Sequence, residues 1–102
     1  MQGHVDGVGS IRSVEPEGAG KRIWIDAHAD VIRYCVEKGS IAVDGASLTI
    51  AALDDAGFAV ALIPHTLAET TLGSLAPGDA VNLEVDVLAK YVERLLPSTM
   101  GR

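Results

Sequence analysis

The chain has 102 residues, of which 48% are hydrophobic, and a formal net charge of −6. This length and composition suit one small domain with one core, and they exclude an intrinsically disordered chain. The acidic balance and the scattered lysines and arginines exclude a broad electrostatic surface for nucleic acid, and the single cysteine excludes an internal disulfide.

The N-terminal part predicts two paired strands. Residues His4 to Val14 are strand-like but contain Gly7 and Gly9, which suggests bulges or a sharply curved sheet. The segment Glu15–Gly20 is expected to be a turn, because a proline followed by two glycines does not hold regular structure. The chain then returns as a strand over Lys21–Ala27, so we expect a β-hairpin.

A short helix is expected next. Asp30 is a suitable N-cap for a helix over Val31–Val36, which would end at Lys38-Gly39. Cys35 would act in it as a small hydrophobe, and no partner base suggests a nucleophile.

The segment Ser40–Ile50 is predicted to be a strand pair that is interrupted by Asp44 and Gly45. A hairpin turn at Asp54–Gly57 and a return strand over Phe58–Ile63 follow it.

In the C-terminal part, the hydrophobic pattern changes from the alternation of a strand to the period of a helix. Thr66–Leu75 is a connection with room for one helical turn, and Val81–Val87 alternates strictly, with Asn82, Glu84 and Asp86 on its polar face. Residues 88–102 then predict an amphipathic helix, stopped by Pro97, and a tail. We therefore expect a barrel or sandwich over residues 1–87, followed by this helix.

Two hydroxyl side chains mark the central strand. Ser47 and Thr49 are two residues apart and share one face, whereas Leu48 and Ile50 face the core. The hydroxyls suit the polar edge of a ligand, but they are also ordinary on an exposed strand. Asp44 likewise has two readings, as an acceptor for ligand hydroxyls or for local backbone N–H groups. Gly45 permits a close approach, a sharp bend or a plain bulge.

Three stretches together resemble one family. They are GHVDGVGSI (Gly3 to Ile11), EKGSIAVDGASLTI (Glu37 to Ile50) and IPHTLAETTLGSLAPGDAVNLEVDVLAKYVERLL (Ile63 to Leu96). They are similar to the C-terminal half of riboflavin synthase, the lumazine-binding barrel, over nearly the whole chain. The resemblance implies a six-stranded antiparallel Greek-key barrel with short helices and a C-terminal helix. Because the family's full chain has two tandem barrels, this chain is expected to be a fragment that holds the second.

The resemblance also implies an activity. The family converts two molecules of 6,7-dimethyl-8-ribityllumazine into riboflavin and 5-amino-6-ribitylaminouracil, with no metal or organic cofactor. Its full enzyme is a trimer joined through C-terminal helices, and each active site lies between barrels of neighbouring subunits. We expect one barrel alone to bind lumazine or riboflavin weakly and to catalyse poorly.

Candidate site residues follow from matching the family's motifs to this chain. The resemblance implies catalytic roles for His4, Ser47 and Asp86, and substrate contacts by Val5, Lys38, Asp44, Gly45, Ser47, Thr49, Ile63 and Thr66. Several have ordinary alternatives: Lys38 would suit a helix C-terminus, Ile63 the core, and Asp86 an exposed strand face.

The expected partners are a small-molecule lumazine or riboflavin and further copies of the chain, as a dimer or trimer. No nucleic acid, membrane or metal is expected, because the histidines lack metal-ligand spacing and the apolar runs are short. The absence of a signal pattern indicates a cytoplasmic protein. A non-catalytic binding module of the lumazine and flavin antenna type is the alternative function, and a barrel that only mediates assembly is a third.

Overall fold

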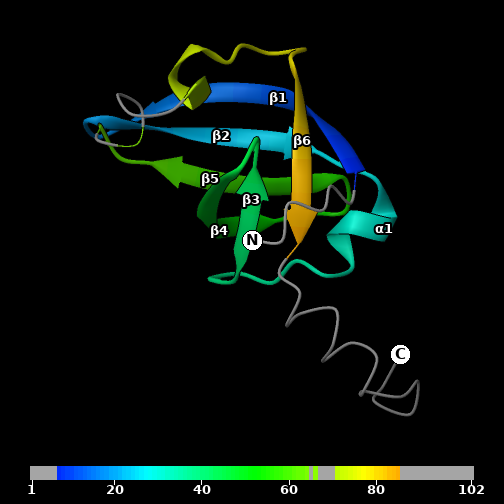
Figure 1. Cartoon of the computed structure of the whole chain (residues 1–102). Coiled ribbons are helices and arrows are strands. Elements are labelled where there is room, and N and C mark those ends of the chain that lie inside the picture. The colour runs from blue at the N-terminus through cyan, green and yellow to red at the C-terminus, as the bar shows by residue number, and fades with distance from the viewer. Residues whose placement is uncertain (1–6, 65, 67–70, 86–102) are drawn as a thin grey trace.

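Six antiparallel strands close into a barrel in the computed structural model, which describes residues 7–64, 66 and 71–85. Around the barrel the order is β1-β2-β5-β4-β3-β6, and β1 pairs with β6 to close it (Figure 1). The meander β3-β4-β5, followed by β6 returning to lie beside β3, is a Greek key. The predicted six-stranded barrel is confirmed. The elements are β1 (Gly7–Glu17), β2 (Gly20–Asp26), α1 (Ala29–Ile32), β3 (Ser40–Val43), β4 (Ala46–Leu53), β5 (Gly57–Leu62), the 3-10 turn η1 (Thr71–Ser74) and β6 (Ala80–Val85).

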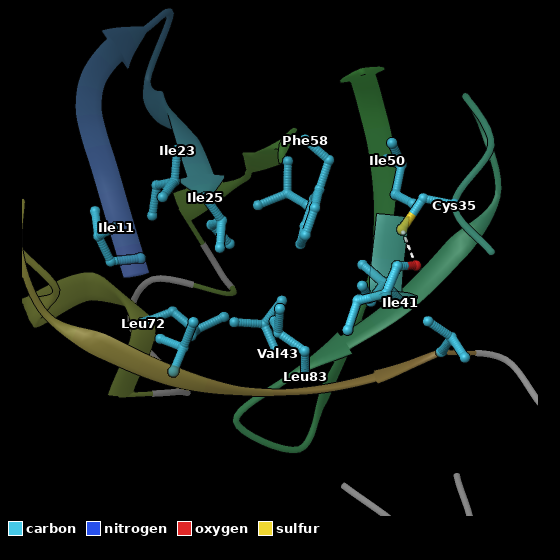
Figure 2. Packing of buried hydrophobic residues seen from close by; sticks show 14 of the residues in the cluster. Ile11, Ile23, Ile25, Cys35, Ile41, Val43, Ile50, Phe58, Leu72 and Leu83 are labelled. Atoms are coloured by element: carbon cyan, nitrogen blue, oxygen red, sulfur yellow. Dashed lines mark hydrogen bonds between the residues drawn. The ribbon is translucent and has the colours of Figure 1, made fainter. Parts of the chain in front are cut away.

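The interior of the barrel is a packed hydrophobic core (Figure 2). Alternate residues of the strands point inward, and Phe58 of β5 is the largest of the fully buried side chains. Isoleucines from β1, β2, β3 and β4 surround it, with Leu72 from η1 and Leu83 from β6 beneath. Small barrels are filled by side chains in this way. A binding site is therefore to be sought on the outer surface.

The first hairpin is longer than the sequence predicts. The expected turn at Glu15–Gly20 is wrong, because β1 continues through Pro16 and Glu17 and only Gly18-Ala19 form the turn. Among the described residues, β1 pairs with β6 over Gly7–Ser10 and not at Pro16, so the edge of β1 that faces away from β2 needs no backbone donor there.

The helix after β2 is shorter and begins earlier than expected. His28 is its N-cap, and the His28 Nδ1 atom accepts a hydrogen bond from the Asp30 backbone N–H at 3.0 Å. The predicted Asp30 cap is therefore wrong. The predicted extent to Val36 is also wrong, because bonds between residues three apart, such as Cys35 N to the Ile32 carbonyl, replace the helical pattern. Within the described part of the chain, no helix is long and apolar enough to cross a membrane.

Cys35 is buried just beyond this helix, as Figure 2 shows. Burial raises the pKa of its thiol to about 11, so the thiol stays protonated near neutral pH. This agrees with the predicted role of a small hydrophobe, although Cys35 lies outside the helix.

The β3–β4 connection is a two-residue hairpin turn. Val43 pairs with Ala46, and the two residues between them, Asp44 and Gly45, have φ values of 48° and 86°. Positive φ at both central residues is the signature of a type I′ turn, for which Asp-Gly is a preferred sequence. The predicted strand pair and the sharp bend at Gly45 are confirmed, whereas the reading of Gly45 as a bulge is wrong.

Replacing Gly45 by alanine should lower the free energy of unfolding by about 1–2 kcal/mol, the cost of a left-handed conformation for an ordinary residue. An added Cβ would meet nothing within 4 Å, so the loss would be conformational rather than steric. Urea denaturation measures it. Gly45→Asn is the matched control and should lose less, because asparagine tolerates positive φ. Equal losses for both variants would contradict this explanation.

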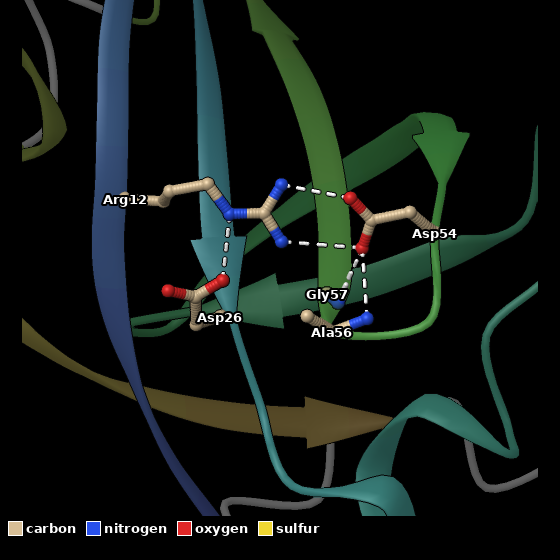
Figure 3. Close-up of polar contacts among 5 residues, drawn as sticks. All are labelled: Arg12, Asp26, Asp54, Ala56 and Gly57. Carbon is tan, nitrogen blue, oxygen red and sulfur yellow. Dashed lines mark hydrogen bonds and ion pairs between the residues drawn. The ribbon is translucent and has the colours of Figure 1, made fainter.

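A charged cluster on the outer surface joins three separate parts of the chain (Figure 3). The register of β1 against β2 shifts between Ile11 and Ser13, so Arg12 lies in a β-bulge. Its guanidinium donates two bonds to the Asp54 carboxylate, at 2.8 and 3.1 Å, and one to Asp26 at 2.7 Å. It also lies 5.0 Å from the centre of the Trp24 ring. Arg12 therefore ties β1 and β2 to the β4–β5 turn.

This cluster predicts an acid-dependent stability. Hydrogen bonds, first from Arg12 and then from the Ala56 backbone, lower the pKa of Asp54 to about 2 from its ordinary 3.8. The stabilisation is therefore fully present above about pH 4 and is lost as the pH falls through about 2. Asp54→Asn should lower the melting temperature modestly at pH 6, because the pair is exposed, and this difference should shrink steadily between pH 4 and pH 2. Asp55→Asn, in the same turn, is the control and should change neither.

Candidate functional site: the outer face of β4

Two hydroxyl side chains stand on the outer face of β4. Ser47 and Thr49 are exposed, Ile50 is fully buried in the core, and Leu48 is partly buried against it. The predicted division of this strand into a polar outer face and an apolar inner face is confirmed. Hydroxyls both donate and accept hydrogen bonds, so this face can bind a ligand with carbonyl, ring-nitrogen or hydroxyl groups.

The neighbouring strand β3 adds a third hydroxyl that the sequence analysis missed. Ser40 pairs with Thr49, and Ala42 pairs with Ser47. Ser40 is exposed, and side chains of directly paired residues lie on the same face. The sequence did contain the information needed to find Ser40. Asp44-Gly45 is typical of a two-residue turn, and such a turn fixes the register of the hairpin and so pairs Ser40 with Thr49.

The strand on the other side of β4 is β5, which is followed by an exposed apolar side chain. Ile50 pairs with Val60, both pointing inward. The pairing of β4 with β5 ends at these two residues, and Ile63 directly follows β5. Ile63 is 61% exposed, so its reading as a core residue is wrong. An exposed isoleucine offers an apolar contact to a flat heterocyclic ring, and its position relative to Ser47 stays a prediction.

Lys38 is held next to β4 by its backbone. Its N–H donates to the Ile50 carbonyl at 2.7 Å, and the Ile50 N–H donates to the Gly39 carbonyl at 2.9 Å. Lys38 has a φ of 68° and an exposed side chain. Its reading as the C-terminal cation of a helix is wrong, because α1 ends at Ile32. Lys38 is therefore available at the edge of the hydroxyl-bearing face.

Asp44 has a structural role at the tip of the β3–β4 hairpin. Its Oδ1 accepts from the Asn82 N–H at 2.7 Å, and its own N–H donates to the Asn82 carbonyl at 2.9 Å. Asp44 therefore accepts from a backbone N–H, but the predicted local partner is wrong, because this N–H belongs to Asn82 on β6. This bond fixes the hairpin that carries Ser47. Contact of Asp44 or Gly45 with a ligand stays a prediction.

The remaining candidates are only partly placed. Thr66 is half-buried beyond Pro64, and its position relative to Ser47 stays a prediction. His4, Val5 and Asp86 lie outside the described residues, as does the predicted helix over residues 88–102. Among the residues that the structure describes, no group of three histidine, cysteine or acidic side chains is arranged to hold a metal ion.

Among the described residues, the site is an outer face of the sheet that offers the hydroxyls of Ser40, Ser47 and Thr49, with a lysine at its edge. These residues would contact a flat ligand from one side. A reaction between two rings stacked face to face would need a second protein surface, here called the second wall, to hold the other ring.

Comparison with known proteins places this face in context. A family model described as "Lumazine binding domain" matches residues 2–86. The riboflavin synthase of Mycobacterium tuberculosis (strain ATCC 25618 / H37Rv) is 54% identical over 101 residues, which covers 96% of this chain and 50% of that protein. The chain thus spans about half the length of the curated relatives it matches. The crystal structure of LumP complexed with 6,7-dimethyl-8-(1'-D-ribityl) lumazine superposes with a TM-score of 0.79 at 25% sequence identity, and the match covers 85% of this chain and 49% of LumP. The crystal structure of LumP complexed with flavin mononucleotide superposes with a TM-score of 0.77 at 26% identity, and the match covers 83% of this chain and 48% of LumP.

Proposed function

Since the chain belongs to the lumazine binding domain family, we propose that it is the C-terminal ligand-binding barrel of a riboflavin synthase. The outer face of β4 binds 6,7-dimethyl-8-ribityllumazine or riboflavin. The observation that carries this proposal is the exposed pair Ser47 and Thr49, aligned by the hairpin register with Ser40. The similarity to riboflavin synthases and to lumazine-bound LumP supports the choice of ligand.

The reaction of the full enzyme would be the dismutation of two lumazines. A proton leaves the 7-methyl group of one lumazine, the anion attacks the second, and ring closure and elimination give riboflavin and 5-amino-6-ribitylaminouracil. Holding two rings face to face supplies about 7–11 kcal/mol of the barrier reduction in well-oriented reactions. The face on β4 orients one ring. The second ring needs another wall, so we expect this chain alone to bind ligand and to turn over slowly.

Titration with riboflavin, with lumazine turnover measured alongside, tests the proposal. We expect riboflavin fluorescence to change saturably on addition of the protein, and lumazine consumption to be far below that of a complete two-barrel riboflavin synthase. No binding at high micromolar riboflavin or lumazine would overturn the proposal and favour a barrel that only mediates assembly. Turnover at the rate of the complete enzyme would overturn the expectation that a second wall is needed.

A non-catalytic binding module is the second candidate, because LumP shares the fold and is solved with the same ligand class. The two functions differ in chemistry and not in binding. The chain should therefore be mixed with the N-terminal barrel of a riboflavin synthase. Restored riboflavin formation supports the synthase assignment, whereas ligand binding without any product supports the binding module.

We also propose that the chain self-associates, as a dimer in which two faces supply both walls or as a trimer. Sedimentation of the purified chain separates these masses. A monomer at all concentrations, with and without riboflavin, would contradict this.

A further inference from the structure

One lysine stands at a position where its strand otherwise places core residues. Lys21, Ile23 and Ile25 follow one another at intervals of two along β2 and therefore share a face. Both isoleucines are 1% exposed, and Leu62, which pairs with Lys21 from β5, is 2% exposed. Lys21 thus points to the inner side of the barrel, near the start of β2. An ammonium group at such a position needs a polar partner.

The side chain of Lys21 finds this partner in η1. Its Nζ donates to the Gly73 carbonyl at 3.4 Å. The last carbonyl groups of a helix have no partner within it, and a lysine is well suited to bind them. The neighbouring Leu72 is 2% exposed and points into the core (Figure 2). The turn η1 is therefore held by an apolar contact and by the bond from Lys21.

The backbone of Lys21 holds a second point of the chain. Lys21 pairs with Leu62 in the ladder between β2 and β5. The preceding Gly20 approaches this strand so closely that an added Cβ would clash with the Leu62 carbonyl and lie 3.4 Å from the Ile63 Cα. Lys21 thus fixes the chain at Leu62 through its backbone and at Gly73 through its side chain.

We propose that Lys21 is a positioning residue of the ligand site, which holds Ile63 and Thr66 where they can contact the ligand. This inference rests on the proposed function. Both residues lie in the sequence between the two points that Lys21 fixes, and Ile63 is too exposed for packing alone to hold it. Lys21 faces the interior and the ligand face is outside, so Lys21 acts through these residues. Without its bond to Gly73 the binding arrangement would be less populated, and the apparent Kd would rise in proportion.

Lys21→Met removes the ammonium group and keeps an unbranched side chain of similar length. In the full chain it should weaken riboflavin binding about three- to tenfold, as measured by fluorescence titration. Lys21→Arg keeps a charged donor and should retain most of the affinity. Thermal unfolding shows that each variant is folded at the temperature of the titration. Unchanged riboflavin affinity in folded Lys21→Met would overturn the inference.

A double-mutant cycle separates positioning from a general effect on the barrel. The background Ile63→Ala/Thr66→Val lacks both predicted contacts and keeps the hydroxyls of Ser47 and Thr49 for binding. Adding Lys21→Met to this background should cost no further affinity, because the residues that Lys21 positions no longer contribute. The same loss in this background as in the wild type would overturn the inference.

Arg22→Met is the matched control. Arg22 is the next residue of β2, and its Nε donates to the Glu17 carboxylate at 2.7 Å. The variant removes the same charge from the other side of the strand, so riboflavin affinity should not change. A loss equal to that of Lys21→Met would overturn the inference, because it would show an effect of charge and not of the bond to Gly73. Failure of the wild-type protein to bind riboflavin or lumazine at all would instead overturn the proposed function.

Discussion

Replacing Phe58 by alanine is expected to lower the free energy of unfolding by about 3–5 kcal/mol. Phe58 is 0% exposed and is the largest fully buried side chain of the core. Its removal would leave a cavity among isoleucines from several strands, which the closed barrel can fill only partly (Figure 2). The total free energy of unfolding of a native domain is about 5–15 kcal/mol, so this one substitution would remove a large share of it.

Urea denaturation of the variant and of Phe58→Leu measures this effect. The leucine variant keeps most of the buried volume and should lose clearly less. A loss below about 1.5 kcal/mol for the alanine variant would show that the core collapses around the gap. The ligand face would then be less rigidly supported than the packing indicates.

The sequence predicts the barrel well because the physics of its strands is local. Alternation along residues 81–85, the Asp-Gly turn and the hydroxyl pair on β4 all follow from a period of two and from turn chemistry. These signals place Ser47 and Thr49 outward and Leu48 and Ile50 inward, as the structure has them.

The features that the sequence analysis missed depend on contacts between distant strands. Arg12 reaches Asp54 because a bulge lies at its position in β1, and the glycines that indicate a bulge in this strand do not show that it falls at Arg12. Asp44 bonds Asn82 across the sheet, 38 residues away. Glu84 is buried at a position that alternation assigns to the surface. The short helix was mispredicted for a different reason, because His28 competed successfully with Asp30 as the cap.

The double variant Ser47→Ala/Thr49→Val should weaken riboflavin binding by about 1–3 kcal/mol, or roughly 5- to 150-fold in Kd, because it removes two hydrogen-bonding groups. Both side chains are exposed and face away from the core, so stability should hardly change. Fluorescence titration gives the affinity, and thermal unfolding checks the fold.

Ser10→Ala is the matched control for this double variant. Ser10 is also an exposed serine on a strand, but it lies on β1, three strands away from β4 around the barrel in either direction. It should bind riboflavin like the wild type. If the control weakened binding as much as the double variant, the ligand would not lie on β4. If neither the control nor the double variant weakened riboflavin binding, Ser47 and Thr49 would be ordinary surface residues. The spacing of the two hydroxyls is compatible with that alternative. A loss confined to the double variant would show that β4 forms the wall against which the first ring is held.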